Sequence, residues 1–230
     1  MKTIGLIGGM SWESSLEYYR IINEKVKKEL GGLHSAQSLM YSVDFENIKN
    51  LQHEGKWDDL TTIMIDAAKR LEKGGADIIV ICTNTMHKMA EDIQNNIDLP
   101  LIHIADTTAQ AIKELKLNKI GLLGTKFTME QDFYKGRLTE KHGLSVVIPN
   151  NEDRDIVHKI IYNELCQGNI KDSSKKEYIR IIENMVKNGA EGVILGCTEI
   201  PLLIKQGDVN VPVFDTTTIH AEQAVLQAIK

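Results

Sequence analysis

The chain of 230 residues is 42% hydrophobic and 26% charged, an ordinary globular composition with enough length for two lobes of about 110 residues. Its net charge of −5 comes from interspersed acidic and basic residues without a Lys/Arg-rich stripe, which argues against nucleic acid or an anionic membrane as a partner. No segment approaches the ~18 consecutive apolar residues that a membrane-spanning helix needs.

Short apolar runs alternate along the chain with amphipathic segments of helical length. We predict strands at 2–7, 38–45, 77–82, 101–104, 120–123, 146–148, 192–195 and 211–214. We predict helices at 12–29, 57–73, 107–115, 129–141, 153–165, 173–188 and 217–229. Strands that alternate with helices indicate βαβ units and a mostly parallel sheet covered on both faces, so the predicted fold class is α/β.

The first apolar run is too short for a signal peptide and ends in a glycine turn, as a buried first strand does. The three cysteines, Cys82, Cys166 and Cys197, are far apart and have no CxxC spacing. This pattern argues against a disulfide framework and a structural zinc site, and it predicts a reduced, cytoplasmic protein.

Three segments of the first half recur in the same order in the second half. Segment 4–8 (IGLIG) recurs at 120–124 (IGLLG), and 73–77 (KGGAD) recurs 114 residues later at 187–191 (KNGAE). Segments 99–102 (LPLI) and 106–108 (DTT) recur together at 211–217 (VPVFDTT). One such match arises by chance among α/β strands, but three in order favour a duplication. We therefore predict two similar lobes, 1–105 plus 215–230 and 106–214.

The repeat also distinguishes between the cysteines. At an offset of 114, Thr83 falls opposite Cys197, and Cys82 falls opposite Gly196. Side chains alternate between the two faces of a strand, so Cys82 and Thr83 cannot both point into one site. The repeat selects Thr83, and Cys82 and Cys166 are interpreted as structural residues.

Glycine and small polar residues follow four of the predicted strands, where ligands bind in open α/β sheets. They lie at 8–11 (GGMS), 83–85 (TNT), 124–125 (GT) and 197–199 (CTE). The glycine-rich start lacks the G-x-G-x-x-G spacing of dinucleotide sites, and 124–126 (GTK) lacks the spacing of a P-loop. Nucleotide binding is therefore disfavoured.

Together these segments resemble the aspartate/glutamate racemase family, and the resemblance runs nearly from end to end. It is carried by 8–11 (GGMS), 84–87 (NTMH) and 196–200 (GCTEI), with further agreement at 34–36 (HSA), 44–45 (DF) and 128–132 (TMEQD). Family members consist of two similar α/β lobes, related by a pseudo-two-fold duplication, with the active site between them. The resemblance implies an amino-acid substrate, no cofactor, no metal and, as is common in the family, a homodimer.

The sequence departs from the family at one catalytic position. Family members use two cysteines, one on each face of the substrate, and the usual first motif is Cys-Asn-Thr-x-His, whereas Thr83 stands here in place of the first cysteine. The Thr83/Cys197 pair resembles the branch described as specific for L-aspartate and L-glutamate. A thiol can both take and give a proton near neutral pH, but an aliphatic hydroxyl is a poor base. We expect Cys197 to be the main acid/base and turnover to be slow or stereochemically one-sided.

The remaining site predictions come with structural alternatives. Cys197 can instead be a buried core cysteine, Thr83 a helix cap, and Met10 a core residue. Glu199 can raise the pKa of the neighbouring thiol or bind the substrate ammonium, and His87 can orient the site or fill the core. The predicted substrate-binding residues are Met10, Gln52, Asn84, Thr85, Thr125, Thr128, Glu164, Thr198 and Glu199, with Gln52 and Glu164 resting only on the layout of the family.

Three functions compete on this basis. The first is racemisation of aspartate or glutamate. The second is a one-base, decarboxylase-like reaction that uses a single effective thiol. The third is an amino-acid-binding protein in which Thr83 has left only vestigial catalysis. Fold alone does not decide among them.

Overall fold

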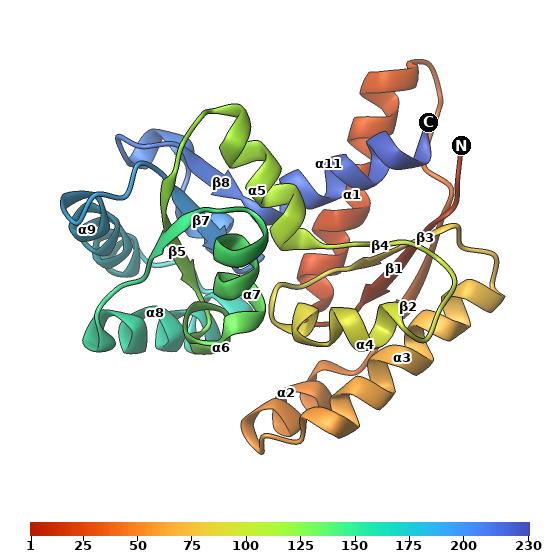
Figure 1. Cartoon of the computed structure of the whole chain (residues 1–230), viewed down its shortest axis with the longest axis horizontal. Coiled ribbons are helices and arrows are strands. Elements are labelled where there is room, and N and C mark those ends of the chain that lie inside the picture. Colours follow the sequence, from red (N-terminus) through yellow and green to blue (C-terminus); the bar gives the residue numbers. More distant parts are fainter. The chain divides into compact units, whose positions relative to one another are not determined.

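The computed structural model describes residues Met1–Lys230 as two compact units (Figure 1). Unit 1 consists of Met1–Ile104 and His220–Lys230, and unit 2 consists of Ala105–Ile219. The chain passes from one unit to the other within two helices, α5 (Ile104–Glu114) and α11 (Thr216–Ala228). Each unit has its own parallel sheet and its own core, so the predicted α/β fold with two lobes is confirmed.

Unit 1 is built on a four-stranded parallel sheet in the order β2-β1-β3-β4. Its strands are β1 (Ile4–Gly8), β2 (Ser38–Ser42), β3 (Ile78–Ile81) and β4 (Leu101–Ile102). Its helices are α1 (Trp12–Leu30), α2 (Phe45–His53), α3 (Trp57–Lys73), the short 3₁₀ helix η1 (Thr85–Met89), α4 (Ala90–Gln94) and most of α11.

Alternate residues of the central strands in unit 1 enter two different apolar clusters. Ile4 and Leu6 of β1 pack with α1 and α11, whereas Ile7 packs with α2, α3 and η1. Figure 1 shows α1 and α11 on one side of this sheet and α3 and α4 on the other. Cys82, directly after β3, belongs to the cluster of α1 and α11 and is fully buried. The strand alternation therefore directs its thiol into the core, and Thr83 comes next.

Unit 2 repeats this arrangement with the sheet order β6-β5-β7-β8. Its strands are β5 (Lys119–Gly124), β6 (Ser145–Val147), β7 (Val193–Gly196) and β8 (Val213–Asp215). Besides α5, its helices are α6 (Lys126–Glu130), α7 (Asp132–Gly136), the π-helical turn η2 (Arg137–Lys141), α8 (Asn151–Asn163), η3 (Leu165–Gln167), α9 (Asp172–Lys187), α10 (Ile200–Leu203) and η4 (Gln206–Asp208). In both sheets the second strand lies at the edge beside the first, as a duplication predicts.

The core of unit 2 lies between its sheet and helices α8, α9 and α10. Leu123 of β5 and Leu195 of β7 pack there against helix residues such as Ile161 and Ile181. Cys197 packs against the rim of the same cluster. A parallel strand whose two faces are both covered must be apolar along its whole length, which accounts for the short hydrophobic runs of the sequence.

All eight predicted strands are present, but two of them end at least two residues earlier than predicted. The strand predicted at 38–45 stops at Ser42, because Asp44 accepts a hydrogen bond from the Glu46 N–H and caps α2. The strand predicted at 101–104 stops at Ile102, because α5 already begins at Ile104. At the first of these strand ends, a polar cap residue overrides the apolar patterning.

The helix predicted at 129–141 is wrong in its start and its continuity. Thr125 accepts a hydrogen bond from the Thr128 N–H and starts α6 at Lys126. Gln131 then has extended backbone angles, which separates α6 from α7 before the turn η2. The helices α2, α4 and α10 and the 3₁₀ helix η1 were not predicted, because segments of four to nine residues hold too few turns to display a period.

Candidate active site

Cys197 lies directly after β7, in the loop that leads to α10. The preceding residue, Gly196, pairs with Gly124 at the end of the neighbouring strand β5. A Cβ atom at Gly196 would lie 2.7 Å from the Leu123 carbonyl oxygen, so only glycine permits this close approach of the two strands. The pairing places the residues after Gly124 beside those after Gly196.

The Cys197 thiol forms a hydrogen bond within its own loop. Its Sγ donates to Oε2 of Glu199 over 2.9 Å. Thr198 Oγ1 donates to the same carboxylate oxygen over 2.7 Å. Thr198 and Glu199 are buried, whereas Cys197 is only partly so. In this motif a thiol and a hydroxyl therefore donate hydrogen bonds to the same oxygen of a buried carboxylate.

This environment favours the neutral thiol. Burial raises the pKa of Cys197 well above its ordinary value, and the negative charge of Glu199 raises it further. The hydrogen bond from Sγ to Glu199 acts in the same direction, because it requires the proton to stay on sulfur. Of the two roles predicted for Glu199, the structure supports the one in which it raises the pKa of the thiol.

Thr125 and Thr128 lie at the end of β5, on the strand next to β7. Their hydroxyl oxygens are 3.2 Å apart, and both side chains are buried. The side chain of Thr128 also lies against both strand-end glycines, since a Cβ atom at Gly124 would be 3.0 Å from it and a Cβ atom at Gly196 would be 3.3 Å from it. Unit 2 thus brings four predicted site residues close to Cys197: Thr125, Thr128, Thr198 and Glu199.

Thr83 occupies the corresponding place in unit 1, after β3. It is partly buried, and the residues that follow it, Asn84 and Thr85, are buried at the start of η1. The Thr83 carbonyl accepts a hydrogen bond from His87 Nδ1 over 2.8 Å. The cap residue of η1 is Asn84 and not Thr83, so the capping alternative for Thr83 has no support in the geometry.

The glycine-rich turn follows β1, which is the strand next to β3. The Gly9 N–H donates to Ser15 Oγ over 2.8 Å, and Ser14 Oγ donates to the Cys82 carbonyl over 3.0 Å. These bonds fasten the turn and the Thr83 segment to the start of α1. Met10 is buried in the apolar cluster of α2 and α3, in agreement with its alternative as a core residue.

Gln52 and Glu164 have different surroundings. Gln52 is buried on α2, and its Nε2 lies 3.1 Å from the Met86 sulfur, which places it beside η1 and the Thr83 segment. Glu164 follows α8 and accepts hydrogen bonds from Ser174 Oγ at 2.5 Å and from Lys171 Nζ at 3.2 Å. These two partners belong to the start of α9 and not to the Cys197 loop.

Two tyrosines near Cys197 were not singled out from the sequence. Burial raises the pKa of both Tyr162 and Tyr178, and negative charge at Cys197 adds to the effect. Tyr178 is fully buried and donates to the Val157 carbonyl over 3.2 Å. Their helical positions match ordinary core positions of α8 and α9, so nothing in the sequence distinguished them.

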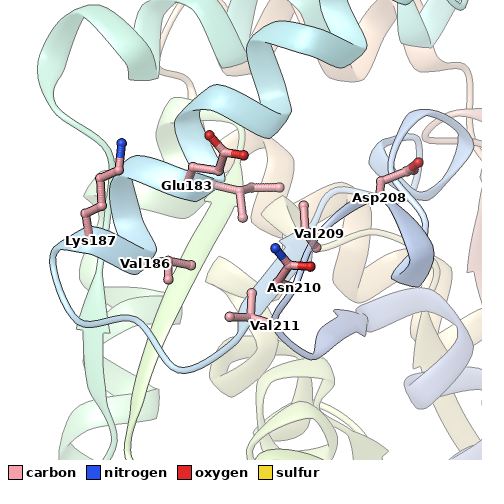
Figure 2. Close-up of a pocket in the computed structure, with 8 residues that line it drawn as sticks. Glu183, Val186, Lys187, Asp208, Val209, Asn210 and Val211 are labelled. Atoms are coloured by element: carbon pink, nitrogen blue, oxygen red, sulfur yellow. The ribbon is translucent and has the colours of Figure 1, made fainter.

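Each unit contains a cavity. In unit 1, Tyr41, Asp44, Asn47 and Asp66 are among the residues that line about 480 Å³ at the carboxyl end of β2. In unit 2, a cavity of about 280 Å³ lies between the end of α9 and residues 208–211, with Val209 and Val211 beside Glu183 and Asn210 (Figure 2). The second cavity precedes β7 and β8, so it lies at the opposite ends of these strands from Cys197.

Two further chemical features bear on function. No group of three or more His, Cys, Asp and Glu side chains is arranged to hold a metal ion. None of the helices combines the length and the hydropathy required to cross a lipid bilayer.

The whole chain was compared with known protein families, and the result agrees with the two sheets and the order of the polar motifs. The profile described as Asp/Glu/Hydantoin racemase matches residues 7–224. The chain belongs to this family. It is an amino-acid racemase of the Asp/Glu racemase family, and its substrate is therefore an amino acid.

Solved structures and curated relatives agree with this assignment. The fold matches a putative Asp/Glu racemase from Yersinia pestis with 54% identity and a TM-score of 0.94 over 100% of both chains. It also matches an aspartate racemase homologue from Pyrococcus horikoshii with 40% identity and a TM-score of 0.86, again over 100% of both chains. A broad-specificity amino-acid racemase from Bacillus subtilis is 24% identical over 96% of each sequence.

Proposed function

We propose that the chain catalyses cofactor-independent racemisation of aspartate or glutamate, with Cys197 as the main acid/base and Thr83 in the opposing position. The observation that carries the proposal is the hydrogen bond from the Cys197 thiol to Glu199 over 2.9 Å, at the carboxyl end of β7. Similarity to the aspartate racemase homologue from Pyrococcus horikoshii supports an acidic amino acid, whereas the Bacillus subtilis relative suggests a broader range. A homodimer, as is common in the family, stays a prediction.

The Cys197–Glu199 pair can move a proton in either direction. When Cys197 gives its proton to a substrate carbanion, a C–H bond forms and the thiol becomes a thiolate. In the reverse step the thiolate takes the α-proton, and the electron pair of the C–H bond stays on the substrate. Before that step the thiol must lose its own proton, and the adjacent Glu199 carboxylate is positioned to accept it.

Thr83 makes the removal of the α-proton unequal for the two enantiomers. Its hydroxyl can return a proton to a carbanion, because a carbanion is a far stronger base than an alkoxide. The hydroxyl is a poor acceptor for an α-proton, because it would first have to lose its own. The enantiomer whose α-proton faces Cys197 should therefore lose that proton more readily.

The polar residues around the two motifs provide hydrogen bonds to the substrate. We assign Asn84, Thr85, Thr125, Thr128 and Thr198 to the ammonium and the carboxylates. Donors fixed in buried positions stabilise the charge that develops when the α-proton leaves, since they require no reorganisation. The proposed set of substrate-binding residues also includes Met10, Gln52, Glu164 and Glu199.

The binding-protein alternative draws on one specific observation. Burial and Glu199 raise the pKa of the Cys197 thiol, and the opposing residue is a threonine, so neither position offers a ready base. A protein with these two residues can bind an amino acid without turning it over. Measuring the exchange of the α-proton distinguishes binding from racemisation.

The experiment follows the α-proton. The purified protein is incubated in deuterated buffer with L- and D-aspartate and L- and D-glutamate in separate samples, without added cofactor. Proton NMR measures the loss of the α-proton signal, and chiral chromatography measures inversion. Exchange together with inversion is expected for at least one of the two amino acids. Calorimetric binding without exchange would select the binding-protein alternative.

Replacement of Cys197 tests the assignment of the acid/base. Cys197→Ala should lower both exchange and inversion by about 10²- to 10⁴-fold, the usual contribution of a positioned acid/base group. Cys166→Ser serves as the matched control, because Cys166 also packs against the core of unit 2 but has no proposed role. Equal activity of the wild type and Cys197→Ala would exclude the mechanism.

A further inference from the structure

Three buried histidine rings pack together beside the Thr83 segment. The ring centroid of His87 lies 4.7 Å from that of His103 and 5.4 Å from that of His220. Their relative exposures of 2%, 6% and 0% place all three out of reach of bulk water. The cluster lies where the first segment of unit 1 ends, at Ile104, and where its second segment begins, at His220.

The hydrogen bonds of His87 define its tautomer. The backbone N–H of Ile104 points at Nε2 over 3.2 Å, and an amide N–H can only donate. Nε2 is therefore the unprotonated nitrogen, so the ring proton is on Nδ1 and is donated to the Thr83 carbonyl over 2.8 Å. His87 thus uses both nitrogens, one on the Thr83 segment and the other on the first turn of α5.

The surroundings of His87 keep this tautomer in place. Burial lowers the pKa of His87 well below its ordinary value, and a second proton on Nε2 would face the N–H of Ile104. The neighbouring His220 is fixed in the same way, because Tyr18 Oη lies 2.8 Å from Nδ1 and the Ile102 carbonyl lies 2.8 Å from Nε2. A carbonyl only accepts, so His220 carries its proton on Nε2.

The bond to Thr83 fixes a peptide plane and not only a single atom. The carbonyl of Thr83 and the N–H of Asn84 belong to one planar group, which is trans, since the cis peptide bond of the chain is Met10–Ser11. When the carbonyl is held by His87, the N–H of Asn84 points the opposite way. The side chains of Thr83 and Asn84, which flank this plane, are oriented with it.

We propose that His87 is a positioning residue for the Thr83 side of the racemase, acting through the Thr83–Asn84 peptide plane. This inference rests on the proposed opposing role of Thr83. In this proposal His87 does not contact the substrate. Its loss should therefore impair proton delivery on the Thr83 side and spare α-proton removal by Cys197.

Two substitutions separate the two hydrogen bonds of the ring. In His87→Asn, the side-chain amide is at about the position of Nδ1, so it can still donate to the Thr83 carbonyl while the bond to Ile104 is lost. In His87→Gln, the longer side chain reaches the position of Nε2 and can accept from Ile104, while the donor to Thr83 is lost. Both variants remove the imidazole, so each controls for the loss of packing in the other.

The measurement is the ratio of inversion to α-proton exchange in deuterated buffer, for the enantiomer that exchanges faster in the wild type. His87→Gln should lower this ratio about tenfold, because exchange with retention needs only Cys197 whereas inversion also needs the Thr83 side. His87→Asn should keep a ratio close to that of the wild type. His220→Gln, which alters the same cluster without contacting Thr83, should also keep it.

The possible outcomes distinguish this inference from the proposed function. If the wild type exchanges no α-proton, the proposed function fails first. If the wild type is active but His87→Gln lowers exchange and inversion equally, His87 is only structural and the inference is wrong. The same holds if His87→Asn and His87→Gln have equal ratios. Circular dichroism and thermal unfolding verify that the compared variants are folded.

Discussion

The Cys197 thiol and the Glu199 carboxylate share one hydrogen bond, with Sγ 2.9 Å from Oε2. Thr198 donates to the same oxygen, so this carboxylate oxygen accepts two bonds from its own loop. The arrangement keeps the proton on sulfur and holds a carboxylate ready to receive it. A substrate ammonium near Glu199 would weaken its pull on the thiol proton and favour the thiolate only when substrate is bound.

The first prediction concerns the reactivity of this thiol. Because the pKa of Cys197 is raised well above its ordinary value, the thiolate fraction at pH 8 is small. We expect alkylation of Cys197 by iodoacetamide at pH 8 to be at least about tenfold slower than that of free cysteine. Mass spectrometry of the peptide that contains Cys197 follows the reaction between pH 7 and 10.

Glu199→Gln provides the matched comparison for that measurement. The amide keeps the shape and an acceptor oxygen but removes the negative charge that raises the pKa of the thiol. Alkylation at pH 8 should be faster in Glu199→Gln than in the wild type. A half-maximal rate near pH 8 in the wild type would contradict the raised pKa.

The second prediction concerns the asymmetry caused by Thr83. The two enantiomers have equal free energies in solution, so kcat/KM must be equal in both directions, and the asymmetry has to be measured from exchange. In the wild type, one enantiomer should exchange its α-proton faster than it inverts. Thr83→Cys introduces a second thiol and should raise the ratio of inversion to exchange by about 10²-fold.

Thr83→Ser is the control for the shape and polarity of that position. It keeps a hydroxyl, so its ratio of inversion to exchange should remain close to that of the wild type. If Thr83→Cys has the same ratio as Thr83→Ser, Thr83 does not face the substrate and the internal repeat has placed the opposing group wrongly.

The accuracy of the sequence predictions has a physical origin in the parallel sheets. Strands such as β3 and β7 are covered on both faces, so they appear as short apolar runs bounded by turn residues. The repeat could be found because it preserves strand-end residues that cannot vary freely, such as Gly124, the counterpart of Gly8, where a Cβ atom would lie 2.8 Å from the Gly196 carbonyl oxygen. Short helices such as α10 escaped prediction because four residues complete only one turn.

The candidate site could be predicted only in part. Residues close together in sequence, such as Cys197 and Glu199, were found together because their contact is local. The contact of Gln52 with Met86 and that of Glu164 with Ser174 depend on how α2 and α9 pack, which no motif encodes. The bond between His87 and Ile104 is likewise tertiary, although the histidine itself belongs to a recognised motif.

The third prediction concerns the glycine-rich turn after β1. Gly9 has φ +89°, and a Cβ atom there would overlap the backbone of Val43, whose nitrogen would be 2.6 Å away. Gly9→Ala should lower the free energy of unfolding by more than about 3 kcal/mol, because a left-handed conformation and a backbone clash act together. Urea unfolding followed by circular dichroism measures the change.

Gly55→Ala separates the two contributions. Gly55 also has a positive φ, +71°, but a Cβ atom there would meet no atom within 4 Å. Gly55→Ala should lower the free energy of unfolding by only about 1–2 kcal/mol, which is the strain of an alanine in a left-handed conformation. Equal losses in Gly9→Ala and Gly55→Ala would mean that the turn shifts away from Val43 without penalty.

The fourth prediction concerns the dependence of stability on pH. Burial lowers the pKa of His220 from 6.5 to about 4, so the folded protein keeps this ring neutral where the unfolded chain already binds a proton. The contribution of His220 to stability is complete above pH 6.5 and is lost as the pH falls from 6.5 towards 4. Between pH 7 and pH 5 this single group should lower the free energy of unfolding by about 2 kcal/mol.

His220→Gln cannot take up the proton but can still donate to the Ile102 carbonyl, so its stability should fall by about 2 kcal/mol less than that of the wild type over the same interval. Urea unfolding of both proteins at pH 7 and pH 5 gives the two differences, and equal differences would mean that His220 is protonated in the folded state.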